Sequence, residues 1–187
     1  MVPRTRWSAI PWWCLLLTLI LLPVGFSACR PQPPLSPEAE AFRQEVRGIL
    51  KRLQESLAAP TAQRDIAAID KILATTAGTI PGICVDCPYR SGVLDGSGIL
   101  LTTFPKTEIV GMNFSSYTRL RESMERQRIT QRPVFLPDRS KMYFITAPLI
   151  HERRVVGAVV LGLTAADLER KWHLREDEFL AIDLNTP

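Results

Sequence analysis

Two cysteines three residues apart, Cys84 and Cys87, are the residues whose type and spacing point most directly to chemistry. A Cys-x-x-Cys pair exchanges thiols and disulfides when the first thiolate lies at the start of a helix that follows a strand. Here the pair lies in or just after a predicted strand, and the segment Pro88–Gly92 that follows it predicts a loop. The pair therefore favours a structural disulfide or two free thiols, with redox activity as the alternative.

The other candidates for chemistry are weaker. Haem attachment requires a histidine after the second cysteine, where Pro88 stands. A zinc site requires two further ligands, and His151 and His173 are not spaced as a pair. A metal ion bound between two molecules is the alternative that this spacing leaves. The segment Asp95–Gly98 is not followed by the helix and lysine of a phosphate loop, and it predicts a turn. We expect neither enzyme activity nor a cofactor.

Residues 1–28 show the three-part layout of a secretory signal: a basic start, the apolar run Cys14–Leu22 and a stretch of small residues. The sequence Phe26-Ser27-Ala28-Cys29 resembles the bacterial lipobox, in which the cysteine is lipidated and becomes the mature N-terminus. We expect Cys29 to carry a lipid that anchors an exported protein on the periplasmic side of the inner or outer membrane. An uncleaved anchor helix is the alternative.

Composition limits the classes of partner. The leader holds two arginines and no acid, so removing it lowers the excess of basic over acidic residues from four to two. An excess this small gives no electrostatic argument for nucleic acid. Residues 29–36 are rich in proline and predict a stiff tether. They precede one predicted domain over residues 37–173 and a charged C-terminal tail over residues 174–187.

The segment Ser36-Pro37-Glu38 predicts the start of a long helix, with an N-cap, a proline at the first position and an acid in the first turn. Apolar residues then recur every three or four positions, which predicts one buried stripe. We expect Pro60 to interrupt this helix and Thr61 to cap a second one. The stripe favours packing on a sheet, and dimerisation through it is the alternative.

Beyond Gly78 the apolar pattern changes to that of strands. A short helix is expected from Ser115 or Ser116 to Gln127, and the capping box at Thr164 predicts a final helix. The polar residues 151–154 have the length of a hairpin connection. The predicted strands cover residues 80–86, 92–96, 99–104, 134–136, 142–150 and 155–163. This order predicts an α+β fold, an antiparallel sheet with a long N-terminal helix and short helices on its faces.

A long helix and four later motifs, in the right order, resemble the Cache domain, the PAS-like extracytoplasmic sensor module of bacterial receptors. A roadblock-type domain is the second resemblance, through Ile80-Pro81-Gly82-Ile83 before a strand and an Asp-Gly turn, but the later Ala-Pro and Val-Gly strands favour Cache. The motifs are Leu94–Leu100, Val110–Ser115, Ala147–Ile150 and Val156–Leu163.

The resemblance implies a pocket between the sheet and the short helix for a small ligand, often a carboxylate or an amino acid. A guanidinium matches a carboxylate in two-point geometry, and a tyrosine hydroxyl can donate beside it. The family often has Arg then Tyr two residues apart, whereas this chain has the reverse order. Most of the neighbouring arginines Arg126, Arg128, Arg132 and Arg139 are expected to be solvated. The candidate ligand-binding residues are Tyr117, Arg119, Arg121, Tyr143 and Thr146.

These observations predict a lipid-anchored, extracytoplasmic sensory module that binds an organic anion or an amino acid and acts through a partner protein, such as a membrane receptor. A homodimer is compatible with the sequence. One alternative is a redox or assembly lipoprotein that uses Cys84 and Cys87. The other is a structural lipoprotein that binds only protein, with residues 172–187 as its docking segment.

Overall fold

The structure is a computed structural model that describes residues 34–79, 90–135, 139 and 141–186. The leader, Cys29 and the Cys84–Cys87 pair lie outside these ranges, as does the strand predicted for residues 80–86. Residues Leu35–Pro187 form one unit by their contacts. No helix within the described ranges is long and apolar enough to cross a membrane.

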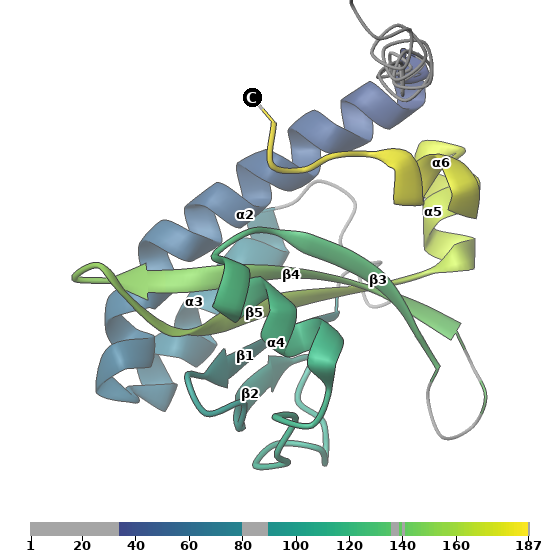
Figure 1. Ribbon diagram of the computed structural model, residues 1–187. Coiled ribbons are helices and arrows are strands. Elements are labelled where there is room, and N and C mark those ends of the chain that lie inside the picture. Colours follow the sequence, from purple (N-terminus) through teal and green to yellow (C-terminus); the bar gives the residue numbers. More distant parts are fainter. Residues whose placement is uncertain (1–33, 80–89, 136–138, 140, 187) are drawn as a thin grey trace, which may run out of the picture. The chain divides into compact units, whose positions relative to one another are not determined.

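The centre of the fold is a five-stranded antiparallel sheet with the order β2-β1-β5-β4-β3 (Figure 1). The two longest strands, β4 and β5, form a hairpin in which His151 pairs with Arg154. Glu152 and Arg153 make the turn with φ angles of 48° and 64°, which confirms the predicted connection. The strands are β1 (Arg90–Asp95), β2 (Leu100–Phe104), β3 (Thr130–Phe135), β4 (Lys141–His151) and β5 (Arg154–Thr164).

The longest helix, α2 (Pro37–Gln63), begins as the sequence predicts. The Ser36 hydroxyl accepts a hydrogen bond from the N–H of Ala39 (3.2 Å), and Pro37 occupies the first turn. The predicted apolar stripe is buried along the whole helix. Its large side chains are Phe42, Val46, Ile49, Leu50, Leu53 and Leu57.

The predicted interruption at Pro60 is wrong, because α2 continues through this residue. A proline removes one backbone donor, and the helix accommodates the loss within its last turns. The chain leaves the helix at Arg64, which adopts the left-handed conformation. Asp65 rather than Thr61 then accepts a backbone hydrogen bond at the start of α3 (Ile66–Thr79).

Two further predicted boundaries are wrong. Helix α4 (Thr118–Arg126) begins after Tyr117, because Ser115 belongs to a turn in which its N–H bonds the Asn113 side chain (2.8 Å). Strand β3 begins at Thr130, four residues earlier than predicted. Its first residues are polar, and the backbone pairing with β4 rather than an apolar pattern holds them in the sheet.

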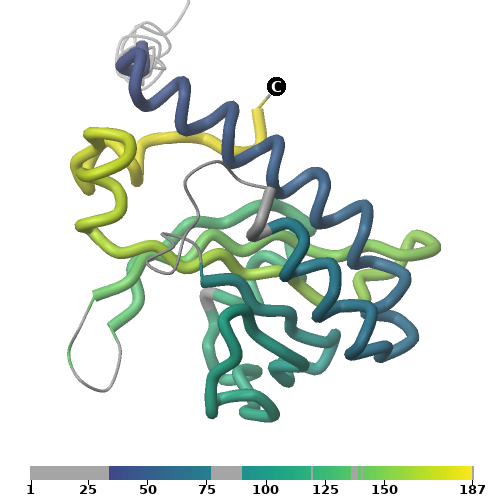
Figure 2. Tube along the Cα trace, turned by 180° about the vertical axis from the view of Figure 1, so that it is seen from behind, coloured from purple at the N-terminus to yellow at the C-terminus, as the bar shows by residue number. Residues whose placement is uncertain are grey.

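Helices cover both faces of the sheet (Figures 1 and 2). Helices α2 and α3 lie on one face, and α4 lies on the other. Helices α5 (Ala165–Trp172) and α6 (Glu176–Ala181) lie beside the N-terminal half of α2. The capping box at Thr164 is confirmed, and so is the α+β fold with helices on the faces of an antiparallel sheet.

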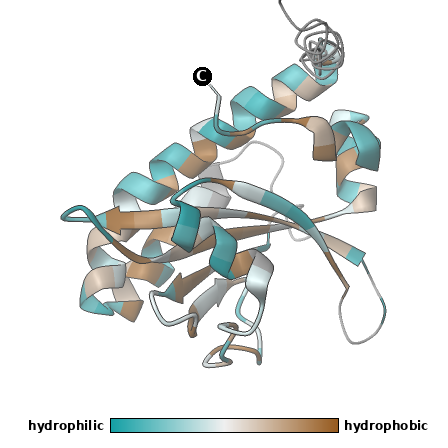
Figure 3. Cartoon of the chain, in the orientation of Figure 1, coloured by the Kyte–Doolittle hydropathy of each residue, from teal (hydrophilic) through white to brown (hydrophobic). Residues whose placement is uncertain are grey.

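The main core lies between α2 and the sheet, and Figure 3 shows the hydrophobic colour along β5 and in bands on α2. Side chains of alternate strand residues reach this core, as the two-residue period of a strand requires. They include Val93, Tyr143, Ile145, Val159 and Leu161.

The segment 174–187, expected as a charged tail, contributes to this core. The Phe179 ring lies 5.6 Å from the Phe42 ring and 5.2 Å from the Tyr143 ring, measured between centroids. The Gln131 amide donates to the carbonyls of Phe179 and Ile182 (2.8 and 2.6 Å) and fixes the segment to β3. The buried side chains of the C-terminal segment are Leu174, Phe179, Ile182 and Leu184.

We predict that Phe179→Ala lowers the free energy of unfolding by about 3–5 kcal/mol, because it leaves a cavity beside two aromatic rings. The adjacent Leu180 is 38% exposed, and Leu180→Ala should change stability by less than about 1 kcal/mol. Urea unfolding followed by circular dichroism measures both. Equal effects of the two substitutions would contradict the placement of α6 in the core.

Candidate ligand-binding site

The face of the sheet opposite α2 carries a second, smaller apolar cluster that α4 covers. Thr130 and Thr146 are paired across β3 and β4, and Thr146 is paired with Val160 of β5, so all three side chains share this face. We call this group of residues the α4 face. Its apolar members are Leu94, Leu100, Leu120 and Val160, with Phe114 and Phe144 packed against them.

The segment 105–117 folds back over the outer edge of β2 and leads into α4. The N–H and the carbonyl of Leu100 both bond this segment (2.9 and 2.8 Å), and the N–H of Phe114 donates to the Gly98 carbonyl (2.8 Å). Gly98 has a φ of 86°, and a Cβ atom there would lie 2.9 Å from the backbone nitrogen of Ser115. Glycine at this position lets the segment approach closely, which holds Phe114 against the α4 face.

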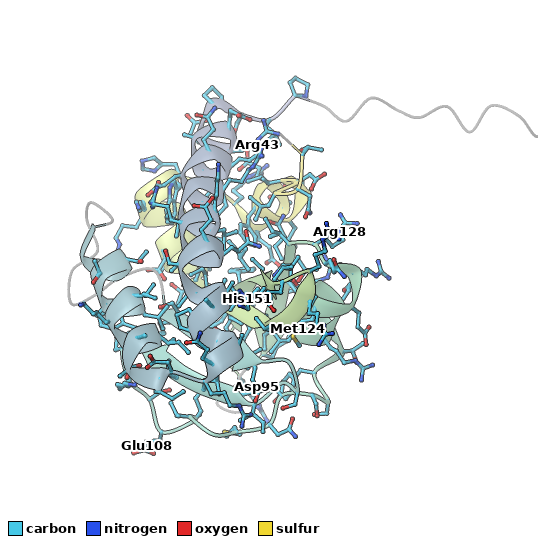
Figure 4. The ribbon with its side chains drawn as sticks, turned by 90° about the vertical axis from the view of Figure 1, so that its left-hand side faces the viewer. Arg43, Asp95, Glu108, Met124, Arg128 and His151 are labelled. Carbon is cyan, nitrogen blue, oxygen red and sulfur yellow. The ribbon has the colours of Figure 1, made fainter. Side chains whose placement is uncertain are left out.

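The Asp95 carboxylate organises the turn between β1 and β2, at the position labelled in Figure 4. One oxygen accepts hydrogen bonds from the N–H and hydroxyl of Ser97 (2.9 and 2.6 Å) and from the N–H of Ile99 (3.0 Å). The other oxygen pairs with the Arg64 guanidinium at the end of α2. Burial raises the pKa of Asp95, but these bonds to the charged form outweigh it and hold the pKa below its ordinary value.

Ser123 attaches α4 to the sheet. Its buried hydroxyl lies 2.9 Å from the Thr146 carbonyl and 2.6 Å from the Arg128 carbonyl. Leu120 lies three residues earlier, on the same face of the helix, and it is buried against the sheet. The hydroxyl group of Ser123 and the side chain of Leu120 therefore fix which side of helix α4 packs on the sheet.

Three of the predicted ligand-binding residues lie at the start of α4. Tyr117 is the residue just before the helix, and Arg119 and Arg121 belong to it. Tyr117 is 49% exposed, and its ring lies 5.2 Å from the Phe114 ring at the rim of the α4 face. Arg119 lies in the first turn of the helix, but its side chain is outside the described part of the chain. Arg121 is exposed and forms an ion pair with Glu125 (2.7 Å) along the helix.

The structure separates the other two predicted residues. Thr146 is buried on the α4 face, whereas Tyr143 is 1% exposed in the main core on the opposite face. The Tyr143 hydroxyl group lies near Glu176 and Lys141. Burial, followed by the hydrogen bond to Glu176, raises the pKa of this tyrosine. Tyr117 and Thr146 can therefore share a site on this face, and Tyr143 does not join them.

The residues predicted from the sequence did not include Ser123, Thr130 or the apolar members of the α4 face. The signal for Ser123 is its spacing of three residues from Leu120, since the two must share one helix face. Thr130 carries no such local signal, because only its pairing with Thr146 brings it to the site.

Within the described ranges, no group of three or more His, Cys, Asp or Glu side chains lies together as a metal site would require. His151 lies at the end of β4, where its Nε2 atom is 4.0 Å from the Glu152 carboxylate. The α4 face combines buried apolar side chains with the hydroxyl groups of Thr130 and Thr146.

No protein-family model matches this chain, and no curated protein matches its sequence. Solved structures match its fold. The ligand-binding domain of the Campylobacter jejuni chemoreceptor Tlp3, in complex with 4-methylisoleucine, aligns with a TM-score of 0.57 and 11% identity over 71% of this chain and 55% of that one. The chain has the fold of a Cache-type sensor domain.

Two further Cache-type domains show the same likeness. The ligand-binding domain of the Pseudomonas aeruginosa amino acid chemoreceptor PctC, in complex with GABA, aligns with a TM-score of 0.53 and 14% identity over 71% of this chain and 61% of that one. The corresponding domain of the Pseudomonas fluorescens chemoreceptor CtaA, with L-isoleucine, gives 0.50 and 15% over 71% and 54%. This chain therefore spans a little over half the length of the Cache-type domains that it matches.

We predict that Asp95 makes stability depend on pH. Its pKa is lowered in the folded state, so its contribution is complete above the unfolded value of about 3.9 and is lost as the pH falls through the folded value. Urea unfolding between about pH 2 and pH 7 should show wild-type stability approaching that of Asp95→Asn at low pH. Glu108→Gln, which removes an exposed carboxylate of the segment 105–117, is the control and should unfold as the wild type does at each pH. A difference between wild type and Asp95→Asn that does not change with pH would contradict the role of this carboxylate.

Proposed function

We propose that this protein is a non-enzymatic sensory module that binds an amino acid or a small organic carboxylate on the α4 face. The observation that carries the proposal is the composition of this face: a buried apolar cluster beside two threonines, covered by α4 and the segment 105–117. The structural neighbours with this fold are ligand-binding sensor domains, and those of Tlp3 and CtaA hold branched-chain amino acids.

The chemistry of the α4 face suits such a ligand. Leu94, Leu120 and Val160 offer an apolar wall for a side chain. A buried carboxylate is stable only when it is paired and hydrogen-bonded. We propose that Arg119 supplies the guanidinium and Tyr117 a hydroxyl from α4. Arg121 extends along the exposed side of the helix, where its pair with Glu125 leaves it a secondary role.

A thermal-shift screen of the full chain in detergent against the amino acids and small organic acids tests this proposal. A ligand at about a hundred times its Kd adds about 2.7 kcal/mol to the stability of the folded state, so a genuine ligand raises the melting temperature measurably. We expect Arg119→Ala to weaken binding about tenfold or more, because it removes a charge-assisted hydrogen bond. Titration calorimetry with the ligand found in the screen gives the Kd.

Two control variants make this result specific. Arg126→Ala removes an exposed arginine of the same helix that pairs with Glu122 (3.2 Å), and Tyr143→Phe alters the opposite face of the sheet. Both should leave the Kd unchanged. A screen in which no amino acid or organic acid raises the melting temperature, or equal loss of binding in all three variants, would contradict the proposal.

We also propose that the protein acts at a membrane, attached through a lipid on Cys29 after removal of residues 1–28, and that it passes its ligand state to a partner protein. The lipobox-like sequence supports this anchor. We predict that the wild-type protein sediments with membranes and incorporates a fatty-acid label, and that Cys29→Ser abolishes the label and the processing. Label incorporation by the Cys29→Ser protein would contradict lipidation at this residue.

A further inference from the structure

A second site candidate lies on a different part of the molecule, in a groove of about 530 Å³ between α2, the end of β4 and the C-terminal segment. One wall is a polar stripe of α2 from Gln44 to Gln54, which covers about 15 Å of helix. The tail forms another wall, because Asn185 exchanges hydrogen bonds with both backbone groups of Ile129 (2.8 and 3.0 Å). Pro148 and Ile150 contribute apolar surface.

Among the described residues, the groove is lined by three basic side chains, Arg47, Lys51 and Arg128, and by no acid. Some other surface cations have acidic partners, such as Lys106 with Asp70 (2.6 Å). In the described part of the chain, none of the three cations of the groove has one within ion-pair distance. Arg47 donates to the carbonyl of Thr186, and Arg128, labelled in Figure 4, lines the groove together with residues of α2.

The positive field of this region also acts on a neighbouring acid. Hydrogen bonds from Asn185, together with the charges of Arg128 and Arg43, hold the pKa of Asp183 below its ordinary value despite its partial burial. Asp183 offsets part of this charge from outside the groove, and the described lining of the groove itself stays basic.

The groove also borders the edge of β4, where the backbone at Pro148 is already closed to strand pairing. The pairing of β3 with β4 ends at Thr146, and β4 continues to His151 without a described strand on that side. The side-chain amide of Gln54 donates to the Pro148 carbonyl (2.8 Å), as the N–H of a neighbouring strand would. Pro148 has no N–H of its own to leave unpaired at this edge.

We propose that this groove binds an extended acidic peptide segment of a partner protein, whose carboxylates pair with Arg47, Lys51 and Arg128. An extended chain advances about 3.3 Å per residue, so four or five residues match the length of the α2 wall. The inference is independent of the ligand proposed for the α4 face.

Fluorescence anisotropy with two labelled octapeptides tests the inference on the full chain in detergent. One peptide alternates Glu with Thr, and the other alternates Gln with Thr. We expect saturable binding of the Glu peptide, at least about tenfold tighter than that of the Gln peptide and weaker at high salt because screening shortens the reach of the charges. Lys51→Gln and Arg128→Gln should each weaken binding at least about threefold.

Arg52→Gln is the matched control, because Arg52 is the exposed neighbour of Lys51 on α2 and does not line the groove. This variant should bind as the wild type does. Absence of saturable binding, equal affinity for both peptides, or equal weakening by Arg52→Gln would overturn the inference. Displacement of the peptide by a similar concentration of inorganic phosphate would identify a small-anion site instead. Binding to phosphatidylglycerol vesicles that Lys51→Gln abolishes, without peptide binding, would identify a membrane-facing surface.

Discussion

The buried apolar face of α2 determines how the rest of the molecule is arranged. Its large side chains meet the alternate residues of β1, β4 and β5 that point to the same side of the sheet. Complete burial of each such side chain contributes about 1.5–3 kcal/mol. Phe42 extends this contact to α5 and α6, through rings 5.0 Å away in Trp172 and 5.6 Å away in Phe179. The face of the sheet that α2 covers is thereby buried in the main core.

The opposite face carries the site that we propose for a ligand. Helix α4 is too polar to provide a large core, and it is attached there by Leu120 and the hydroxyl of Ser123. The Asp95 turn and the close approach at Gly98 fix the segment 105–117 that leads into this helix. The α4 face and the main core are separate clusters, so we expect substitutions on the α4 face to alter the proposed binding without disturbing the main core.

Much of this fold follows from local sequence signals. The Ser36 cap, the stripe of α2, the β4–β5 hairpin and the Thr164 capping box are all encoded within short windows. The sequence also indicates which face of a strand each residue occupies. Tyr143 and Thr146 are three positions apart, and an odd separation places them on opposite sides of a strand. Packing of Phe179 and pairing of Thr130 with Thr146 depend on residues distant in sequence, so no local pattern predicts them.

A methyl NMR titration of the isotope-labelled protein, with an amino acid or organic acid that binds it, locates the ligand site. Chemical-shift changes should concentrate on Leu94, Leu100, Leu120 and Val160, whose methyl groups belong to the α4 face. Methyl groups of Leu50, Leu53 and Leu57, buried under α2, should change little. Shifts that concentrate on these α2 residues, or on the groove beside Ile129 and Ile150, would contradict the assignment of the ligand site to the α4 face.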